Sequence, residues 1–71
     1  MTDLERRILS ECVIAGGWLD VIRYPIVLGD SLVEVFQVGL VVARLHDHGY
    51  IAIRNAVEIR ATAKGRKAIR K

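Results

Sequence analysis

The chain has 71 residues, a net charge of +3 and a single cysteine, and 52% of its residues are hydrophobic. A chain of this length forms one domain, residues 1–71, with little room for a closed catalytic pocket, and one cysteine cannot form an internal disulfide. No uncharged apolar run approaches the roughly 18 residues that a membrane span requires. We therefore expect a small cytoplasmic protein that is not an enzyme, uses no cofactor and has no membrane partner.

The charge is unevenly distributed along the chain. Residues 1–53 carry four basic and seven acidic side chains, which gives −3, whereas residues 54–71 carry seven basic and one acidic side chain, which gives +6. This asymmetry favours contact between the basic C-terminal segment, residues 60–71, and phosphate or another acidic surface. The alternative is a solvated basic tail.

The N-terminal residues have the spacing of a helix start. Thr2 and Glu5 stand three residues apart, as in a capping box, so a helix should begin at Asp3 and end at Gly16. Its apolar stripe is expected to comprise Leu4, Ile8, Leu9, Cys12, Val13 and Ala15. Cys12 is then a small buried apolar residue.

The next segment contains strand formers and one proline. Residues 18–22 predict a short strand, and Pro25 suits the first turn of a helix, so we expect one or two helical turns over residues 25–28. Gly29 would supply the tight turn that follows. Trp18 and Tyr24 could stack on bases, but two aromatic residues without interleaved basic side chains more often complete a small core.

The longest element is predicted over residues 31–48, where helical periodicity explains the sequence better than a strand does. Asp30 or Ser31 could cap its start, and Gly49 could close its end. Its core side is expected to hold Leu32, Val35, Phe36, Val42, Ala43, Leu45 and His46, and its other side Glu34, Gln37, Arg44 and His48.

After Gly49 the periodicity changes to the alternation of a β-hairpin. A three-residue loop over 54–56, with Asn55 or Ala56 in the left-handed conformation, keeps the large apolar side chains on one face. The expected cross-strand pairs are Ile53 with Val57, Ile51 with Ile59, Ala52 with Glu58 and Tyr50 with Arg60, the last allowing a cation–π contact. Thr62 could then cap a final helix over residues 63–70.

This order of elements resembles a winged helix-turn-helix domain. Leu45 followed by Gly49-Tyr50-Ile51 resembles the junction between recognition helix and wing in MarR-like and PadR-like regulators. The segment from Ile59 to Ala68 resembles the threonine, lysine and glycine pattern that follows their second wing strand. The fold class expected is therefore α+β, with three main helices, a small antiparallel sheet and a short C-terminal helix.

The resemblance implies a small DNA-binding transcriptional regulator or accessory factor that contacts double-stranded DNA. The helix over 31–48 would lie in the major groove, and the wing over 50–60 and the basic tail would contact phosphates. Gln37 could pair with adenine and Arg44 with guanine, with Glu34 beside them. The remaining DNA contacts implied are Arg54, Asn55, Arg60, Lys64, Arg66 and Lys67.

A different partner is also consistent with the sequence. Val33, Leu40 and Val41 are expected on the outward face of the long helix, where a base-reading surface should be more polar. So much apolar material in a short chain predicts exposed patches, and such patches mark interfaces. We therefore expect a homodimer or a protein partner. The alternative is a protein-interaction module, a small phage-like protein that binds or inhibits a larger nucleic-acid-processing protein. A third possibility is a homodimer that pairs through this helix and presents its wings to DNA.

The remaining motifs do not predict a metal site or an enzyme. His46 and His48 lie two positions apart on a helix, so their side chains diverge by about 200° and cannot readily share one ion. We expect His46 to be partly buried and His48 to be solvated. Neither Gly16-Gly17 nor Gly29-Asp30-Ser31 has the spacing of a phosphate loop or a nucleophile elbow.

Overall fold

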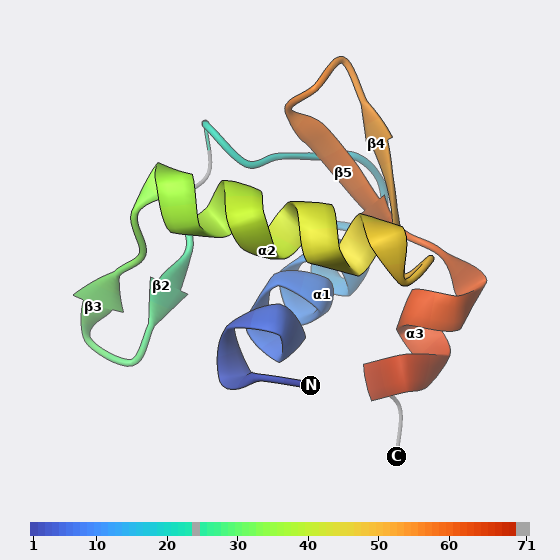
Figure 1. The fold of residues 1–71 in the computed structure, drawn as a ribbon, viewed down its shortest axis with the longest axis horizontal. Coiled ribbons are helices and arrows are strands. Elements are labelled where there is room, and N and C mark those ends of the chain that lie inside the picture. The colour runs from blue at the N-terminus through green and yellow to red at the C-terminus, as the bar shows by residue number, and fades with distance from the viewer. Residues whose placement is uncertain (24, 70–71) are drawn as a thin grey trace.

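The computed structural model describes residues 1–23 and 25–69. These residues form an α+β fold with three helices, a three-stranded antiparallel sheet of order β1-β5-β4, and a separate two-stranded hairpin (Figure 1). The expected α+β class is confirmed. The elements are α1 (Asp3–Ala15), β1 (Leu19–Asp20), β2 (Val27–Leu28), β3 (Ser31–Leu32), α2 (Val35–Asp47), β4 (Ile51–Arg54), β5 (Glu58–Ala61) and α3 (Ala63–Ile69). No helix in the described parts of the chain is long and apolar enough to cross a membrane.

The start and end of α1 are as the sequence predicts. The backbone N–H of Glu5 donates to the Thr2 hydroxyl at 3.2 Å, and the Thr2 N–H donates to the Glu5 carboxylate at 3.1 Å. Gly16 ends the helix with φ 71°. Ile8, Leu9 and Cys12 are buried as predicted, whereas Val13 and Ala15, which were expected in the same apolar stripe, are exposed.

The segment between β1 and α2 is a hairpin and not the expected helical turn. β2 and β3 pair Val27 with Leu32, and the two-residue turn at Gly29 and Asp30 has Gly29 at φ 64°, as in type II′ hairpins. Buried Ile26 accepts a hydrogen bond from the Val33 N–H at 2.9 Å, which ties the base of the hairpin to the core. The tight turn at Gly29 is confirmed, and the helix over 25–28 is wrong.

The long helix α2 begins four residues later than predicted. Ser31 belongs to β3, and the N-cap is Glu34, which makes no side-chain capping bond, so the predicted caps at Asp30 and Ser31 are wrong. The C-terminal end is confirmed: Gly49 has φ 78° and donates to His46 O, while Tyr50 N–H donates to Leu45 O. This is the hydrogen-bond pattern of a Schellman motif.

The rotation of α2 about its axis also differs from expectation. Its buried side chains are Val38, Val41, Val42 and Leu45. Five residues that were expected on the core side are exposed: Leu32, Val35, Phe36, Ala43 and His46. Val41 was expected to face outward, but only 7% of its surface is exposed. The buried residues follow the i, i+3, i+4, i+7 spacing of one helix face, and Phe36 and Ala43 lie outside that spacing.

The hairpin of β4 and β5 has a three-residue loop, as predicted, but its register is shifted by two residues. The pairs are Ile51 with Ala61, Ala52 with Arg60, Ile53 with Ile59 and Arg54 with Glu58. The loop is therefore 55–57, and both Asn55 and Ala56 have positive φ, at 53° and 64°. A shift of two leaves every side chain on its predicted face. The inner face of the sheet buries Leu19, Ile51, Ile59 and Ala61 against the helices.

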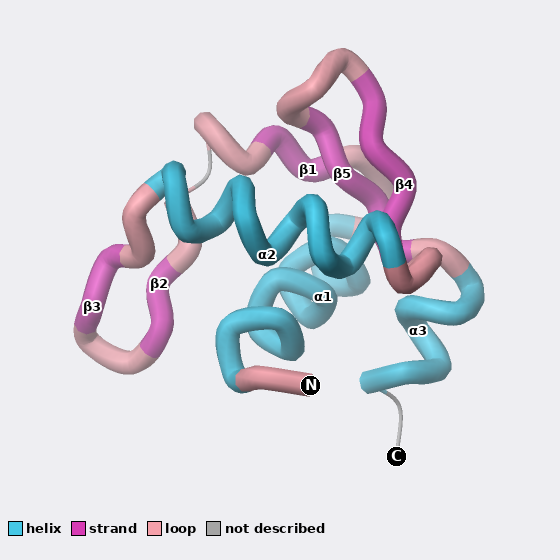
Figure 2. The backbone as a smooth tube through the Cα atoms, viewed as in Figure 1, coloured by secondary structure: helices cyan, strands magenta, loops and turns pink. Residues whose placement is uncertain are grey.

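The last helix, α3, is capped as predicted. The Gly65 N–H donates to the Thr62 hydroxyl oxygen at 3.1 Å, and the Thr62 hydroxyl donates to Gly49 O at 2.7 Å. Figure 2 shows α3 leaving the sheet beside the C-terminal end of α2, and it packs against α1. The predicted end of this helix at Arg70 lies outside the described residues.

Candidate nucleic-acid interface

The outer face of the sheet, which points away from the helices, carries a compact set of polar and aromatic side chains. β-strand alternation puts Ala52 and Arg60 side by side in one row, and Arg54, Glu58 and Asp20 in the next row. Trp18 directly precedes β1. We refer to this surface as the outer sheet face.

The ring of Trp18 lies beside two arginines of the outer sheet face. The guanidinium carbon of Arg54 lies 4.4 Å from the centroid of the Trp18 ring, and that of Arg60 lies 5.7 Å from it. Both distances are within the range of cation–π attraction. The expected cation–π pair between Tyr50 and Arg60 is wrong, because the register shift places Arg60 opposite Ala52. The ring of Tyr50 instead has Lys64 Nζ 5.3 Å away.

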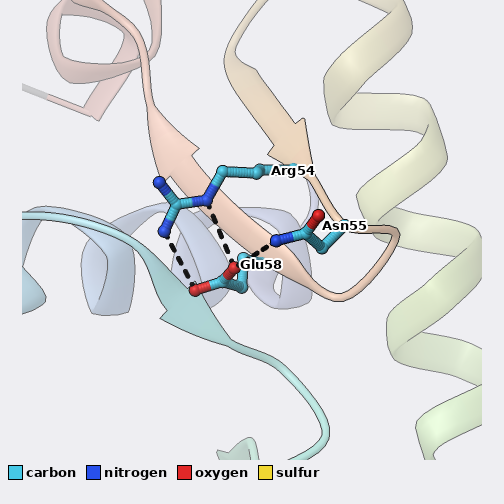
Figure 3. Close-up of polar contacts among 3 residues, drawn as sticks. All are labelled: Arg54, Asn55 and Glu58. Atoms are coloured by element: carbon cyan, nitrogen blue, oxygen red, sulfur yellow. Dashed lines mark hydrogen bonds and ion pairs between the residues drawn. The ribbon is translucent and has the colours of Figure 1, made fainter.

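At the tip of the β4–β5 hairpin, the charge of Arg54 is balanced by that of Glu58 (Figure 3). Arg54 Nε and Nη2 donate to the two carboxylate oxygens of Glu58, each at 3.2 Å, and Asn55 Nδ2 donates to Glu58 Oε1 at 3.1 Å. These bonds, the one from Arg54 first, hold the pKa of the Glu58 carboxyl below its ordinary value. Arg54 and Asn55 lie at the tip of the hairpin as predicted, but both side chains already donate hydrogen bonds to Glu58.

Arg60 and Arg66 both line a hollow between the outer sheet face and α3. The hollow has a volume of about 480 Å³ and is lined by Trp18, Ala52, Arg60, Ala61, Thr62, Ala63 and Arg66. None of these lining residues is acidic. Two guanidinium groups beside an aromatic ring suit an oxyanion such as phosphate, which arginine binds with two parallel hydrogen bonds. We call this site the Trp18 hollow.

The two lysines of α3 have different environments. Lys64 Nζ donates to His48 O at 2.8 Å, at the C-terminal end of α2, where a cation is favourable. Lys67 is exposed one turn after Ala63. Lys64 therefore fastens α3 to α2, whereas Lys67 extends the positive potential of the Trp18 hollow along α3.

The outward face of α2 is apolar where a base-reading helix should be polar. Gln37 is exposed, but Arg44 Nη1 lies 3.7 Å from the carboxylate of Glu5, which is 6% exposed. The same side of α2 exposes the apolar side chains of Phe36 and Leu40, which are 75% and 53% exposed. Of the expected contact patch, Leu40 is exposed, Val33 packs partly against the core and Val41 is buried. Leu40 is on the outward face as predicted, whereas the prediction of Phe36 on the core side is wrong. The i, i+4 spacing of the two residues is the signal that would have placed both on one face.

The other candidate residues do not form a reactive site. His46 and His48 are both exposed, and the His48 ring lies 5.8 Å from that of Tyr50. Within residues 1–23 and 25–69, no three His, Cys, Asp or Glu side chains are grouped to hold a metal ion. Cys12 is buried, and desolvation raises the pKa of its thiol to about 11. Tyr24 lies outside the described residues.

Comparisons with protein-family models, with curated proteins and with solved structures found no match to this chain. Its function therefore has to be argued from the surfaces described above.

Proposed function

We propose that this protein is a small winged-helix nucleic-acid-binding protein that holds the phosphate backbone of double-stranded DNA with its outer sheet face and α3. The observation that carries the proposal is the convergence of Arg60 and Arg66 on the Trp18 hollow, which has no acidic lining residue. Lys67 continues the basic surface. Arginine and lysine contacts to phosphate provide most of the affinity of non-specific DNA binding.

The order of elements supports the winged-helix part of the proposal. A helix, a strand, a second long helix and a two-stranded hairpin follow one another as α1, β1, α2 and β4–β5. One feature departs from the helix-turn-helix pattern: the described residues between β1 and α2 hold the β2–β3 hairpin in place of a helix. We therefore base the proposal on the β4–β5 hairpin and α3, and not on a helix-turn-helix.

Weak sequence preference follows from the outward face of α2. Base edges in the major groove are read by polar side chains, whereas this face exposes the apolar Phe36 and Leu40 beside Gln37. Contacts to phosphate position a protein on DNA without selecting a sequence. A protein of this kind acts as an accessory factor, or as a regulator whose site is chosen by another component.

The proposal is tested by the fluorescence anisotropy of labelled mixed-sequence duplex DNA, titrated at about 50 and 200 mM salt. We expect micromolar or tighter binding at the lower salt and a steep loss at the higher salt. The variant with both Arg60→Ala and Arg66→Ala should bind at least tenfold more weakly. Its salt slope should fall by about 1.8, since each phosphate contact contributes about 0.9.

The matched control replaces two exposed arginines away from the hollow, Arg6→Ala and Arg23→Ala, and removes the same total charge. Its affinity should stay close to that of the wild type. The proposal fails if the wild type does not bind at the lower salt, or if the two double variants lose the same affinity. Circular dichroism of both variants establishes that they are folded.

A second candidate function is favoured by the exposed side chains of α2. If Phe36 and Leu40 contact a different protein, the chain is a protein-interaction module that binds or inhibits a larger nucleic-acid-processing protein, and its basic face speeds the encounter. This candidate predicts that the chain alone is a monomer at all concentrations. The oligomeric state therefore separates it from the inference that follows.

A further inference from the structure

The outward face of α2 alternates large and small apolar residues. Phe36 and Leu40 are large and exposed, whereas Gly39 and Ala43 are small and exposed. We call these four residues the α2 stripe. No charged residue lies between Val35 and Ala43, so a second surface can approach this part of the helix without burying a charge.

Gly39 is not required by the fold of the single chain. Its φ is not positive, and a Cβ at this position would meet nothing within 4 Å. Glycine in the middle of a helix is disfavoured relative to alanine, so the monomer would form α2 more readily without it. Glycine does allow another backbone to approach closely. The α2 stripe thus has a shallow point at its centre that suits the large side chain of a neighbouring helix.

We propose that two copies of this chain pair through α2, with the helices antiparallel and crossing between residues 39 and 40. In this register Phe36 packs on the partner's Ala43, and Leu40 packs on the partner's Gly39. A two-fold axis repeats each contact, so that every large residue meets a small one, as a self-complementary interface requires. A parallel pair would instead place Phe36 on Phe36 and Leu40 on Leu40.

Exposed apolar residues beyond the α2 stripe can contribute to a dimer interface. A stable interface buries roughly 800 Å² on each partner, about a sixth of the 4820 Å² surface of this chain. The α2 stripe supplies its centre. Val35 and Leu32, which are 60% and 67% exposed, continue the apolar surface toward the N-terminal end of α2. We expect a dissociation constant in the micromolar range, because only a few side chains of α2 contribute to the interface.

The dimer leaves the Trp18 hollow open. α2 packs its buried side, which includes Leu45, toward the inner face of the sheet, whereas the hollow lies on the outer sheet face. In Figure 1, α2 crosses the front of the molecule and the β4–β5 hairpin rises from behind its C-terminal end. The dimer therefore carries two hollows, and this inference does not depend on what the hollows bind.

The first test measures mass by analytical ultracentrifugation in the absence of nucleic acid, from about 1 to 500 µM protein. The wild type should move from monomer to dimer over this range. Leu40→Glu and Gly39→Leu should each weaken dimerisation at least tenfold, the second even though leucine is the better helix former. Ile14→Glu is the matched control, because Ile14 is 77% exposed on α1 and outside the stripe.

The second test fixes the direction of the helices by cysteine cross-linking. In the antiparallel register, a Leu40→Cys variant places two thiols near the axis, so it should form a disulfide-linked dimer on mild oxidation. An Asp47→Cys variant places them about 22 Å apart along the axis, given a rise of 1.5 Å per residue, and should not. The native Cys12 is buried and does not compete.

A wild type that stays monomeric up to about 500 µM would overturn the proposal. It would favour a different protein as the partner of α2. An Ile14→Glu variant that dissociates as readily as Leu40→Glu would also overturn the proposal. Cross-linking at both position 40 and position 47 would show a parallel pair and overturn the register. Circular dichroism separates loss of pairing from loss of folding.

Discussion

Gly65 of α3 lies directly against the backbone carbonyl of Tyr50, so closely that a Cβ on Gly65 would overlap the carbonyl oxygen and also touch the Leu9 side chain at 3.2 Å. This contact joins α3 to the start of β4 and to α1. Tyr50 O also accepts a hydrogen bond from the Thr62 N–H at 3.0 Å, so the carbonyl is held in place from a second side.

Gly65→Ala should therefore destabilise the fold although alanine is the better helix former. Overpacking of a fixed backbone costs about 3 kcal/mol, more than the roughly 1 kcal/mol gained in helix propensity. Urea unfolding followed by circular dichroism measures the difference. Gly17→Ala is the control, because a Cβ at Gly17 meets nothing within 4 Å; its free energy of unfolding should change by less than about 0.5 kcal/mol. Equal stability of Gly65→Ala and the wild type would contradict the packing described.

The capping box of α1 makes stability depend on pH. The Thr2 backbone N–H bond to the Glu5 carboxylate is the largest of the influences that hold the pKa of Glu5 below its ordinary value of 4.5. A lowered folded pKa gives stability that is present above pH 4.5 and is lost as pH falls through the lower folded value. We expect Glu5→Gln to reduce stability at pH 7 and to flatten its decline on acidification.

The measurement is urea unfolding at pH 7 and at pH values below 4.5. Thr2→Ala should cost about 1 kcal/mol at neutral pH, because it removes the other half of the box. Glu34→Gln is the control, since Glu34 makes no side-chain capping bond at α2. A Glu5→Gln variant with the full acid dependence of the wild type would show that the capping box does not cause it.

The stacking of Arg54 on Trp18 can be followed by fluorescence, because Trp18 is the single tryptophan of the chain. Arg54→Ala removes both the cation–π contact and the bidentate bond to Glu58. It should shift the Trp18 emission and reduce stability by about 1 kcal/mol. Arg54→Lys should restore little of either, since lysine lacks the planar fork. Emission identical to the wild type in Arg54→Ala would rule out the stacked geometry.

The Cys12 thiol should be unreactive in the folded protein. Its pKa of about 11 leaves about one thiol in a thousand ionised at pH 8, and the thiolate is the reactive form. The residue is also 2% exposed. A thiol reagent such as Ellman's should label the native protein at the rate of global opening and the urea-unfolded protein within seconds. Rapid stoichiometric labelling of the native protein would place Cys12 at the surface.

Local signals in the sequence predicted much of this structure, and tertiary contacts decided the rest. The capping box at Thr2, the Gly49 helix end and the loop with Asn55 and Ala56 in left-handed conformations each depend on residues close in the chain. Pro25 and Gly29 are equally compatible with a helical turn and with a hairpin. The burial of Ile26 against the core favours the hairpin, and no local pattern shows it.

The pairing register of β4 and β5 shows a second feature that the sequence alone could not predict. Alternation fixes which face a side chain occupies but not its partner, because a shift of two residues leaves the faces unchanged. The bonds from Arg54 and Asn55 to Glu58 fit the observed register. The same limit affects the site: the sequence predicts Arg44 and Arg54 as DNA contacts, but the tertiary structure pairs them with Glu5 and Glu58. Arg60 and Arg66 face a hollow without such a carboxylate.

The contact of Leu9 with Gly65 has a consequence for the order in which the newly made chain can fold. Fifty-six positions separate the two residues, and at about 5 to 20 residues per second a ribosome needs about 3 to 11 seconds to add them. During that interval the apolar side of α1 has no α3 to cover it. We therefore expect folding to be completed only after the α3 segment has emerged from the ribosome, and the apolar side of α1 to stay partly exposed until then.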